Sequence, residues 1–187
     1  MGIDVRYVPQ RQQHGTADAV RSARDLVSGQ FLLLNGDMIL KNTDIAKLCR
    51  CKSPCMGIST TDHPGDYGTV MVDDDLVTSL EEKSKHPKSN LINAGAYLFS
   101  PDIFDAVDRV RVSSRGEFEL TDALSEFIAK RELSAHHLSY WMDVGNPWDM
   151  LDANLTLMST LSSESKGIVE DGVSLNGSVV IGEGSVV

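Results

Sequence analysis

The 187-residue chain is acidic, with a formal net charge of -10, which excludes a surface built for nucleic acid or anionic lipid because those partners require clustered Lys and Arg. Its length suffices for one well-packed core and a small appendage. No apolar run reaches the roughly 20 residues that span a bilayer, and no signal-peptide layout opens the chain, so we expect a cytoplasmic protein without nucleic-acid or membrane partners.

The first predicted elements are a strand and a helix, joined by a loop that contains glycine. Residues 3–8 alternate apolar and polar side chains as a half-buried strand does, and Pro9 ends them. Thr16 can cap a helix whose apolar residues recur at helical spacing until Gly29. A glycine at a helix start lets a flat ligand approach the backbone, and an amide such as Gln10 can read the edge of that ligand. An ordinary strand–loop–helix connection fits the same residues.

The most informative stretch is the apolar run at 31–34, which Asn35-Gly36-Asp37 follows. The run shows no alternation, which is typical of a strand buried on both faces in a parallel sheet. In open α/β sheets ligands bind beyond the carboxyl ends of the strands, so Asp37 lies where a charged side chain can serve chemistry. The alternative is that Asp37 only caps the following turn or helix.

The next segments predict an α/β fold with a mixed, mostly parallel, Rossmann-like sheet flanked by helices. A helix from Thr43 and a strand over 56–60 give βαβ order, which favours parallel strands. A hairpin then spans 67–83. A strand over 91–99 precedes a helix that begins at Pro101.

A second candidate carboxylate follows in the last third of the chain. A helix after 117–122 and a strand over 133–138 come first. Asp143 then lies in a tight turn before a further helix, for which Asn146 is the expected N-cap. That helix carries an apolar stripe at helical spacing.

Near the C-terminus apolar residues recur every six positions, with glycines between them: Val169, Leu175, Ile181 and Val187. A hexapeptide period is typical of a β-helix, and about three repeats are needed for stability. We therefore expect a first domain at 1–161, followed at 162–187 by a linker and the first coils of a β-helix.

Seven short motifs occur along the chain. They are Gln10 with Gly15-Thr16-Ala17, Asn35-Gly36-Asp37, Tyr67-Gly68, Glu81-Glu82-Lys83, Asn93-Ala94-Gly95, Glu117-Phe118-Glu119-Leu120-Thr121-Asp122 and Trp141-Met142-Asp143-Val144-Gly145. Each alone is weak, but the set in this order resembles the sugar-1-phosphate nucleotidylyltransferases of the glucose-1-phosphate thymidylyltransferase and N-acetylglucosamine-1-phosphate uridylyltransferase type. The resemblance implies the nucleotide-diphospho-sugar transferase fold, often followed by a left-handed β-helix.

The resemblance also implies a role for each matching residue. Asp37 and Asp143 would bind Mg²⁺, a hard cation that suits one or two carboxylates plus substrate phosphates, and with Lys83 near the sugar phosphate they would form the catalytic set. The nucleotide would contact Gln10, Gly15 and Thr16. The sugar would contact Tyr67, Gly68, Glu82, Asn93 and Gly95.

The implied reaction is attack by a sugar 1-phosphate oxygen on the α-phosphorus of dTTP or UTP, which gives a nucleotide-sugar and pyrophosphate. The family begins with a strand and a glycine-rich loop around the triphosphate, and no such loop precedes Gln10. We therefore expect an N-terminally incomplete chain with weak or no activity, and a homo-oligomer because exposed sheet edges favour pairing. The alternatives are a non-catalytic regulatory subunit that binds sugar phosphate or nucleotide, and a β-helix acyltransferase or assembly module.

Overall fold

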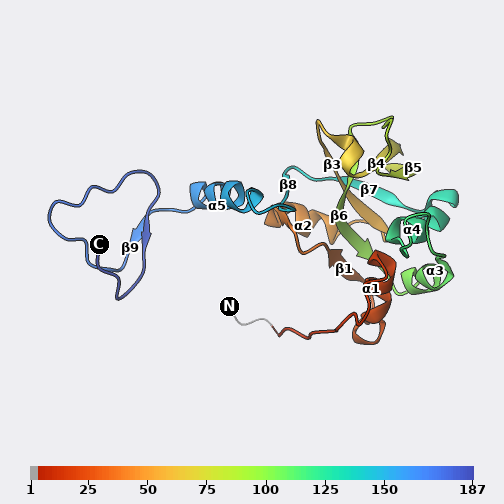
Figure 1. Cartoon of the computed structure of the whole chain (residues 1–187), viewed down its shortest axis with the longest axis horizontal. Helices are drawn as coiled ribbons and strands as arrows, with labels where there is room; N and C mark the ends of the chain where they lie inside the picture. Colours follow the sequence, from red (N-terminus) through yellow and green to blue (C-terminus); the bar gives the residue numbers. More distant parts are fainter. Residues whose placement is uncertain (1–3) are drawn as a thin grey trace. The chain divides into compact units, whose positions relative to one another are not determined.

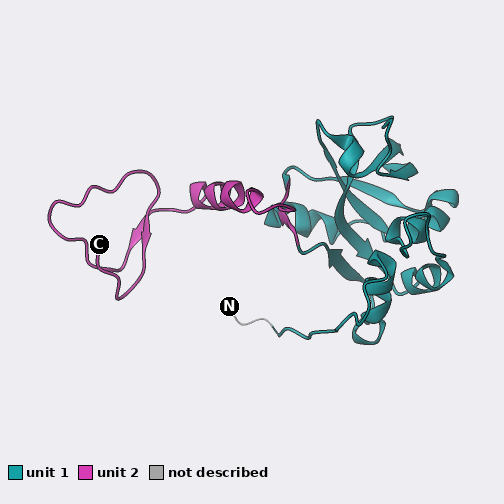
Figure 2. Ribbon diagram, viewed as in Figure 1, with its two compact units in different colours: residues 1–36, 40–141 teal, residues 37–39, 142–187 magenta. Residues whose placement is uncertain are grey.

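The computed structural model describes residues 4–187, and its largest element is a six-stranded sheet with helices packed on it (Figure 1). The chain divides into two units (Figure 2). Unit 1 comprises the described residues up to Gly36 together with Leu40–Trp141, and unit 2 comprises Asp37–Ile39 and Met142–Val187. The boundary expected from sequence between residues 161 and 162 lies within unit 2 and stays a prediction.

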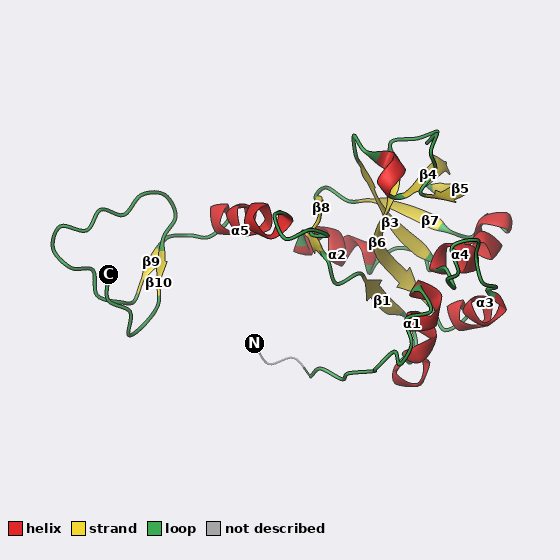
Figure 3. Ribbon diagram, viewed as in Figure 1, coloured by secondary structure: helices red, strands yellow, loops and turns green. Residues whose placement is uncertain are grey.

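Most elements of unit 1 occur in the predicted order, with shifted ends (Figure 3). The helices are α1 (Thr16–Ser22), α2 (Asn42–Leu48), α3 (Ile103–Arg109) and α4 (Leu120–Ala129), with 3₁₀ turns at Arg24–Leu26 and Pro64–Asp66. The strands of the large sheet are β1 (Phe31–Leu34), β3 (Cys55–Thr60), β4 (Gly68–Asp73), β5 (Leu76–Glu82), β6 (Leu91–Phe99) and β7 (Ser134–His137). Two short strands, β2 (Met38–Leu40) and β8 (Trp141–Asp143), form a separate ladder.

The first predicted strand, over 3–8, is wrong where the structure describes it. Residues 4–8 have no regular structure, and residue 3 lies outside the described part of the chain. An alternating pattern becomes a strand only when a neighbouring strand pairs with it. Here the side chain of Tyr7 is 89% exposed, so the pattern has nothing to pack against.

The large sheet is mixed, as predicted, but the expectation that it is mostly parallel is wrong. Its strand order is β1-β6-β3-β7-β5-β4. Strand β6 is antiparallel to both β1 and β3, and β5 is antiparallel to β4 and β7. Strands β3 and β7 are parallel. The βαβ pattern gave β1 and β3 the correct common direction, but β6 inserts between them, and local sequence does not encode such an insertion.

The expectation that strand β1 is buried on both faces is also wrong. All four residues are at least partly exposed, and Leu34 is 42% exposed. Within the described residues β1 pairs with β6 alone, so one long side of the strand is an edge. Phe31 anchors it by stacking on Phe104 at 5.8 Å between ring centroids and by meeting Phe99 edge to face. The apolar run therefore marks one packed face of an edge strand.

Helices α1, α3 and α4 pack on one another, and their apolar residues share one core with the sheet (Figure 3). The helices contribute Ala17, Val20, Ile103, Phe104, Val107, Leu120, Leu124 and Phe127, and the strands contribute Met56, Ile58, Val70, Val77, Tyr97 and Phe99. Burying a Leu or Phe side chain of this kind stabilises the fold by about 1.5 to 3 kcal/mol. The core thus holds the ends of β4, β5 and β6 in place. Within residues 4–187 no helix combines the length and apolarity that crossing a membrane requires.

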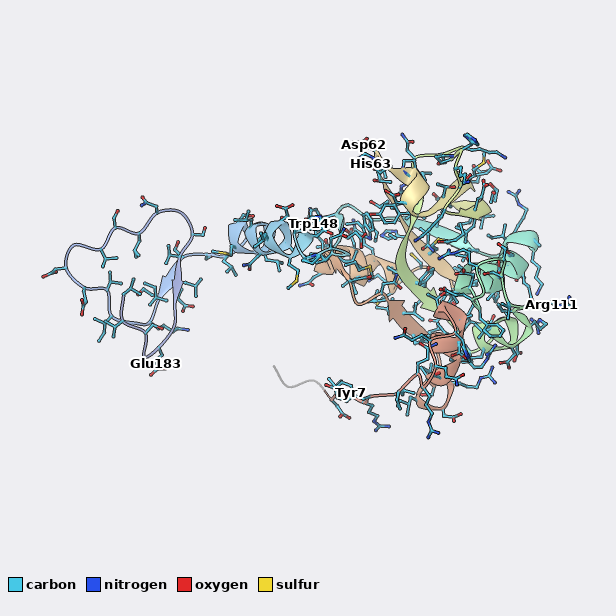
Figure 4. All side chains as sticks on the ribbon, viewed as in Figure 1. Tyr7, Asp62, His63, Arg111, Trp148 and Glu183 are labelled. Atoms are coloured by element: carbon cyan, nitrogen blue, oxygen red, sulfur yellow. The ribbon has the colours of Figure 1, made fainter. Side chains whose placement is uncertain are left out.

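Unit 2 contains helix α5 (Asp149–Ser159) and the short strands β9 (Glu164–Ser165) and β10 (Val180–Ile181). The expected N-cap at Asn146 is wrong: the helix begins at Asp149 with Trp148 in the N-cap position, and Asp149 Oδ2 accepts hydrogen bonds from Asn146 N and Nδ2. The predicted apolar stripe lies largely in solvent, where Trp148 is 65% exposed (Figure 4).

The strands of unit 2 pair in parallel, which fits the hexapeptide pattern. Glu164 and Ser165 pair with Val180 and Ile181, and a further parallel bridge joins Ile168 to Val186. The chain thus returns beside itself after about three hexapeptides, as one coil of a β-helix would. Of the four residues at the six-residue period, Ile181 is buried, whereas the other three are 39% to 47% exposed. The β-helix therefore stays a prediction.

Candidate functional site

Two predicted site residues, Asp37 and Asp143, come together in unit 2. Asp37 directly precedes β2 and Asp143 ends β8, and these two strands form one ladder. Next to the ladder Val144 N donates a hydrogen bond of 2.8 Å to Asp37 O. Asp37 is exposed and Asp143 is half-buried. Backbone pairing therefore places two acidic residues that are far apart in the sequence on neighbouring strands.

The two carboxylates fit a cation that takes few protein ligands. The residues at 4–187 contain no group of three or more His, Cys, Asp or Glu placed to hold a metal ion. Mg²⁺ commonly binds through one or two carboxylates and completes its octahedron with waters and substrate phosphates. Gly145 lies next to this carboxylate, and a Cβ added there would make only ordinary van der Waals contact with Asp143 Oδ2, at 3.4 Å. The donor set is all oxygen, as Mg²⁺ prefers.

A second group of predicted residues comes together in unit 1, where β4, β5 and β6 meet. Gly68 is the register partner of Glu82. A Cβ added at Gly68 would lie 3.0 Å from Glu82 Oε2 and 3.7 Å from Asn93 Cβ. Glycine at position 68 therefore lets the Glu82 carboxylate lie directly against the backbone of β4, and this places a carboxylate and an amide side chain close to one another. Such a pair can satisfy several hydroxyl groups of one ligand.

The amide of Asn93 is held by hydrogen bonds on both sides. Its Nδ2 donates to Tyr97 Oη at 2.7 Å, and its Oδ1 accepts from Gly95 N at 3.1 Å. Gly95 has φ +71°, and a Cβ there would lie 2.5 Å from Asn35 Nδ2. Asn35 N in turn donates to Gly95 O at 2.9 Å. Gly95 therefore joins the Asn93 side chain to the Asn35-Gly36 segment of unit 1.

Glu82 lies in an unusual electrostatic environment. Burial raises the pKa of Glu82, the neighbouring charge of Glu119 raises it further, and Arg115 opposes both effects. Arg115 Nη1 lies 3.5 Å from Glu82 Oε1 and 3.5 Å from Glu119 Oε1. The sequence analysis assigned no role to Arg115, although an arginine two residues before the 117–122 motif was a usable signal.

Tyr67, Lys83 and Trp141 border this group. Lys83 has φ +44° and its N donates to Tyr67 O at 3.1 Å, which fixes the backbone on both sides of the Gly68–Glu82 pair. The Tyr67 and Trp141 rings meet edge to face at 5.3 Å, and Trp141 Nε1 donates to Ala94 O at 3.0 Å. Trp141, whose motif was recognised without a role, thus connects the start of β8 to the strand that carries Asn93.

The residues predicted to contact the nucleotide also lie together, and each has a protein partner. Gln10 Nε2 donates to Gly15 O at 3.2 Å and to Asp18 Oδ2 at 2.8 Å. Gly15 has φ +110° and occupies the N-cap position expected for Thr16. Thr16 is instead the first helical residue, and its Oγ1 accepts a hydrogen bond from Leu120 N at the start of α4.

Gly15 has a structural reason to be glycine. A Cβ there would lie 2.6 Å from Phe118 O and 2.8 Å from Phe118 N. These backbone atoms bond to the same loop, since Phe118 N donates to His14 O and Ala17 N donates to Phe118 O. An open cavity of about 530 Å³ lies alongside, lined by Val8, Pro9, Arg11, Gln12, His14, Asp18 and Ser22.

Comparison with known proteins agrees with these motifs. A family model described as nucleotidyl transferase matches residues 1–160. The chain is 38% identical over 184 residues to the bifunctional protein GlmU of Methanocaldococcus jannaschii, with 97% of this chain and 45% of that protein covered. It is 35% identical over 173 residues to a bifunctional sugar-1-phosphate nucleotidylyltransferase/acetyltransferase of Sulfurisphaera tokodaii, with 90% and 43% covered. The chain thus spans less than half the length of these two relatives.

The fold agrees as well. The crystal structure of a glucose-1-phosphate thymidylyltransferase from Bacillus anthracis in complex with a sucrose superposes with a TM-score of 0.67 at 23% identity. The superposition covers 78% of this chain and 62% of the other. This confirms the predicted nucleotide-diphospho-sugar transferase fold. The chain therefore belongs to the nucleotidyl transferase family and is related to the sugar-1-phosphate nucleotidylyltransferases, as its motifs indicated.

Proposed function

We propose that this chain contributes the metal-binding and sugar-binding residues of an enzyme that transfers a nucleotidyl group from dTTP or UTP to a sugar 1-phosphate. The observation that carries the proposal is the Asp37–Asp143 pair, which the β2–β8 ladder brings together. The products are a nucleotide-sugar and pyrophosphate. Related proteins named for this chemistry support the reaction class.

Each group of residues then has a distinct task. Asp37 and Asp143 would hold Mg²⁺, which when bound supplies positive charge to the phosphate oxygens. Lys83 would pair with the sugar phosphate as a point charge. Glu82 and Asn93 would bind sugar hydroxyls, and the fixed hydrogen bonds of Asn93 leave its amide pre-oriented for them. The reaction needs positioning and charge neutralisation, and no protein nucleophile is required.

The nucleotide would lie against the Gln10–Thr16 segment. Gln10 Nε2 donates both of its hydrogen bonds within the protein, to Gly15 O and Asp18 Oδ2. Its Oε1 is then the side-chain atom left to accept a hydrogen bond from a base. An acceptor suits the N–H that uracil and thymine share. The choice between dTTP and UTP would then depend on contacts to the base methyl and to the ribose.

Binding to the purified chain tests this function. Ligands that bind only the folded state raise its melting temperature. We expect stabilisation by UDP-sugars or dTDP-sugars in the presence of Mg²⁺, and less by ADP-sugars or GDP-sugars. A panel that shows no stabilisation by any pyrimidine nucleotide-sugar would contradict the proposal.

Replacing Glu82 should separate sugar recognition from nucleotide recognition. We expect Glu82→Gln to weaken binding of glucose 1-phosphate or N-acetylglucosamine 1-phosphate by roughly tenfold or more, since a charge-assisted hydrogen bond contributes about 1.5 to 3 kcal/mol. Binding of free UTP or dTTP should change less than twofold. Isothermal titration calorimetry measures both constants.

Glu81→Gln is the matched control, because Glu81 is the exposed neighbour of Glu82 on strand β5. It should bind all ligands as the parent does. Equal losses of sugar phosphate and nucleotide affinity in Glu82→Gln would show that the residue supports the fold, not the sugar pocket.

The parallel pairing in unit 2 supports a second proposal, that residues 162–187 open a hexapeptide β-helix. Its exposed apolar residues, Val169, Leu175 and Val187, would be covered by further coils. Exposed apolar surface of this kind also supports a homo-oligomer. Light scattering of the chain with and without residues 162–187 tests whether the tail carries the association.

A further inference from the structure

Asp44 is a fully buried carboxylate with an unusual set of partners. It lies in the first turn of the short helix α2, where an acidic residue is ordinarily exposed and interacts with the helix dipole. Its Oδ2 accepts three hydrogen bonds: from Ser139 N at 2.8 Å, from Ser139 Oγ at 2.8 Å and from Tyr140 N at 3.2 Å. Its Oδ1 has no hydrogen-bond partner within residues 4–187. All hydrogen bonding of this carboxylate is thus directed at one segment.

The carboxylate stays charged at neutral pH. Burial on its own raises the pKa of Asp44, but the hydrogen bonds from Ser139 and Tyr140 and the charge of Lys47 bring the pKa below its ordinary value. A buried charge is costly unless it is well bonded, and an exposed acid would serve the helix equally well. The burial of Asp44 therefore serves the segment that it binds.

That segment is the link between two strands. Strand β7 ends where Leu138 N donates to Ile58 O, and β8 begins at Trp141. Ser139 and Tyr140 span the gap, and Asp44 binds the backbone N–H groups of both. The carboxylate thus fixes the point from which β8 starts.

Asp44 is also connected along the chain to the other predicted metal ligand, Asp37. Strand β2 follows Asp37 directly, and helix α2, which contains Asp44, follows β2. The chain runs from Asp37 through β2 to Lys41, whose O accepts a hydrogen bond from Asp44 N at 2.9 Å. Asp44 therefore lies just after strand β2, which follows Asp37, and its side chain binds the two residues just before strand β8, which ends at Asp143.

We infer that Asp44 is a positioning residue, whose carboxylate holds the 139–140 link so that β8 presents Asp143 beside Asp37. The inference rests on the proposed function, because the pair must bind a divalent cation for its spacing to matter. Residues that orient metal ligands typically change metal affinity by about 10- to 100-fold when they are replaced. Asp44 acts through backbone and not by contact with a ligand atom, so the lower end of that range applies.

The test measures binding of Mn²⁺ alone, as a paramagnetic substitute for Mg²⁺, by electron paramagnetic resonance of the full chain. We expect Asp44→Asn to raise the dissociation constant roughly tenfold. The matched control is Asp105→Asn, which removes an exposed acid at the corresponding position of α3 and should bind as the parent does. Hydrogen exchange should quicken in peptides covering 139–144 and stay unchanged in peptides from β3 and β6.

Either of two outcomes overturns the inference. Asp44→Asn with parental Mn²⁺ affinity overturns the inference, whatever its exchange at 139–144. If that variant does not fold, Ser139→Ala replaces it, because this change removes only the hydrogen bond from Ser139 Oγ to Asp44. It should weaken Mn²⁺ binding about two- to threefold, which is less than the net contribution of one full hydrogen bond. No change in affinity or exchange in Ser139→Ala likewise overturns the inference.

Asp143→Asn separates this inference from the function on which it rests. If Asp143→Asn loses Mn²⁺ and Asp44→Asn does not, only the positioning role fails. If Asp143→Asn binds Mn²⁺ as the parent does, the proposed metal site fails and the positioning role fails with it.

Discussion

Gly15→Ala should be among the most destabilising single methyl additions in unit 1. The residue has φ +110° and ψ 178°, a conformation that is essentially restricted to glycine. The added Cβ would also lie 2.6 Å from Phe118 O, a backbone atom that cannot move without breaking its bond to Ala17 N. Strain and overpacking together cost about 3 to 5 kcal/mol, which lowers the melting temperature by roughly 10 °C.

Gly29→Ala provides the matched control for this prediction. Gly29 has φ +72°, and nothing lies within 4 Å of the position that its Cβ would take. The change therefore carries only the backbone penalty of about 1 to 2 kcal/mol. Thermal unfolding of the two variants beside the parent gives the comparison. Similar losses in both would mean that the contact with Phe118 yields easily, and that Gly15 is needed for conformation alone.

Gly15 also illustrates how a sequence motif can mislead about the cause of one of its residues. The sequence placed Gln10, Gly15 and Thr16 beside a flat ligand, and the structure does bring them together. The reason for the glycine, however, is a backbone that arrives from more than a hundred residues further on, at Phe118. Local pattern marks a position that needs glycine, but it cannot name the distant atom that requires it.

Strands with strong local signals were predicted well, and their neighbours were not. Strand β6 has the predicted limits, Leu91–Phe99, because a polar loop and a proline bound its apolar residues. Its place between β1 and β3 depends on which edges are free when the sheet assembles, and only the tertiary structure determines that. The burial of β1 was mispredicted for the same reason. A continuous apolar run shows that the strand is hydrophobic, but its exposure depends on how many strands pair with it.

The buried carboxylate at position 44 could not be found from sequence. An acid in the first turn of a helix is usually exposed, because both the helix dipole and solvent favour it there. Asp44 and the exposed Asp105 carry the same local signal and have opposite burial. The difference lies in the 139–140 link, which is distant in sequence and contains nothing that predicts a bond to α2.

Replacing either metal-site carboxylate should produce the largest loss of ligand binding. We expect Asp37→Asn and Asp143→Asn each to weaken binding of Mn²⁺ or Mg²⁺ about a hundredfold, because each removes one of two charges that face a divalent ion. Two unit charges 4 Å apart interact by about 4 kcal/mol at an effective dielectric of 20. Melting temperatures should change little, since Asn keeps the shape of Asp and Asp37 is exposed.

The double variant makes this assignment sharper than either single change. If both carboxylates bind one ion, the loss in Asp37→Asn/Asp143→Asn should fall short of the sum of the single losses, because once one ligand is gone the other holds little. Two independent weak sites would instead give additive losses. Asp152→Asn is the control, since it removes an exposed charge of the same unit in helix α5 and tests whether net charge alone attracts the ion. Additive losses, or a comparable loss in Asp152→Asn, would show that cations collect on an acidic surface, and the β2–β8 ladder would then have no metal-binding role.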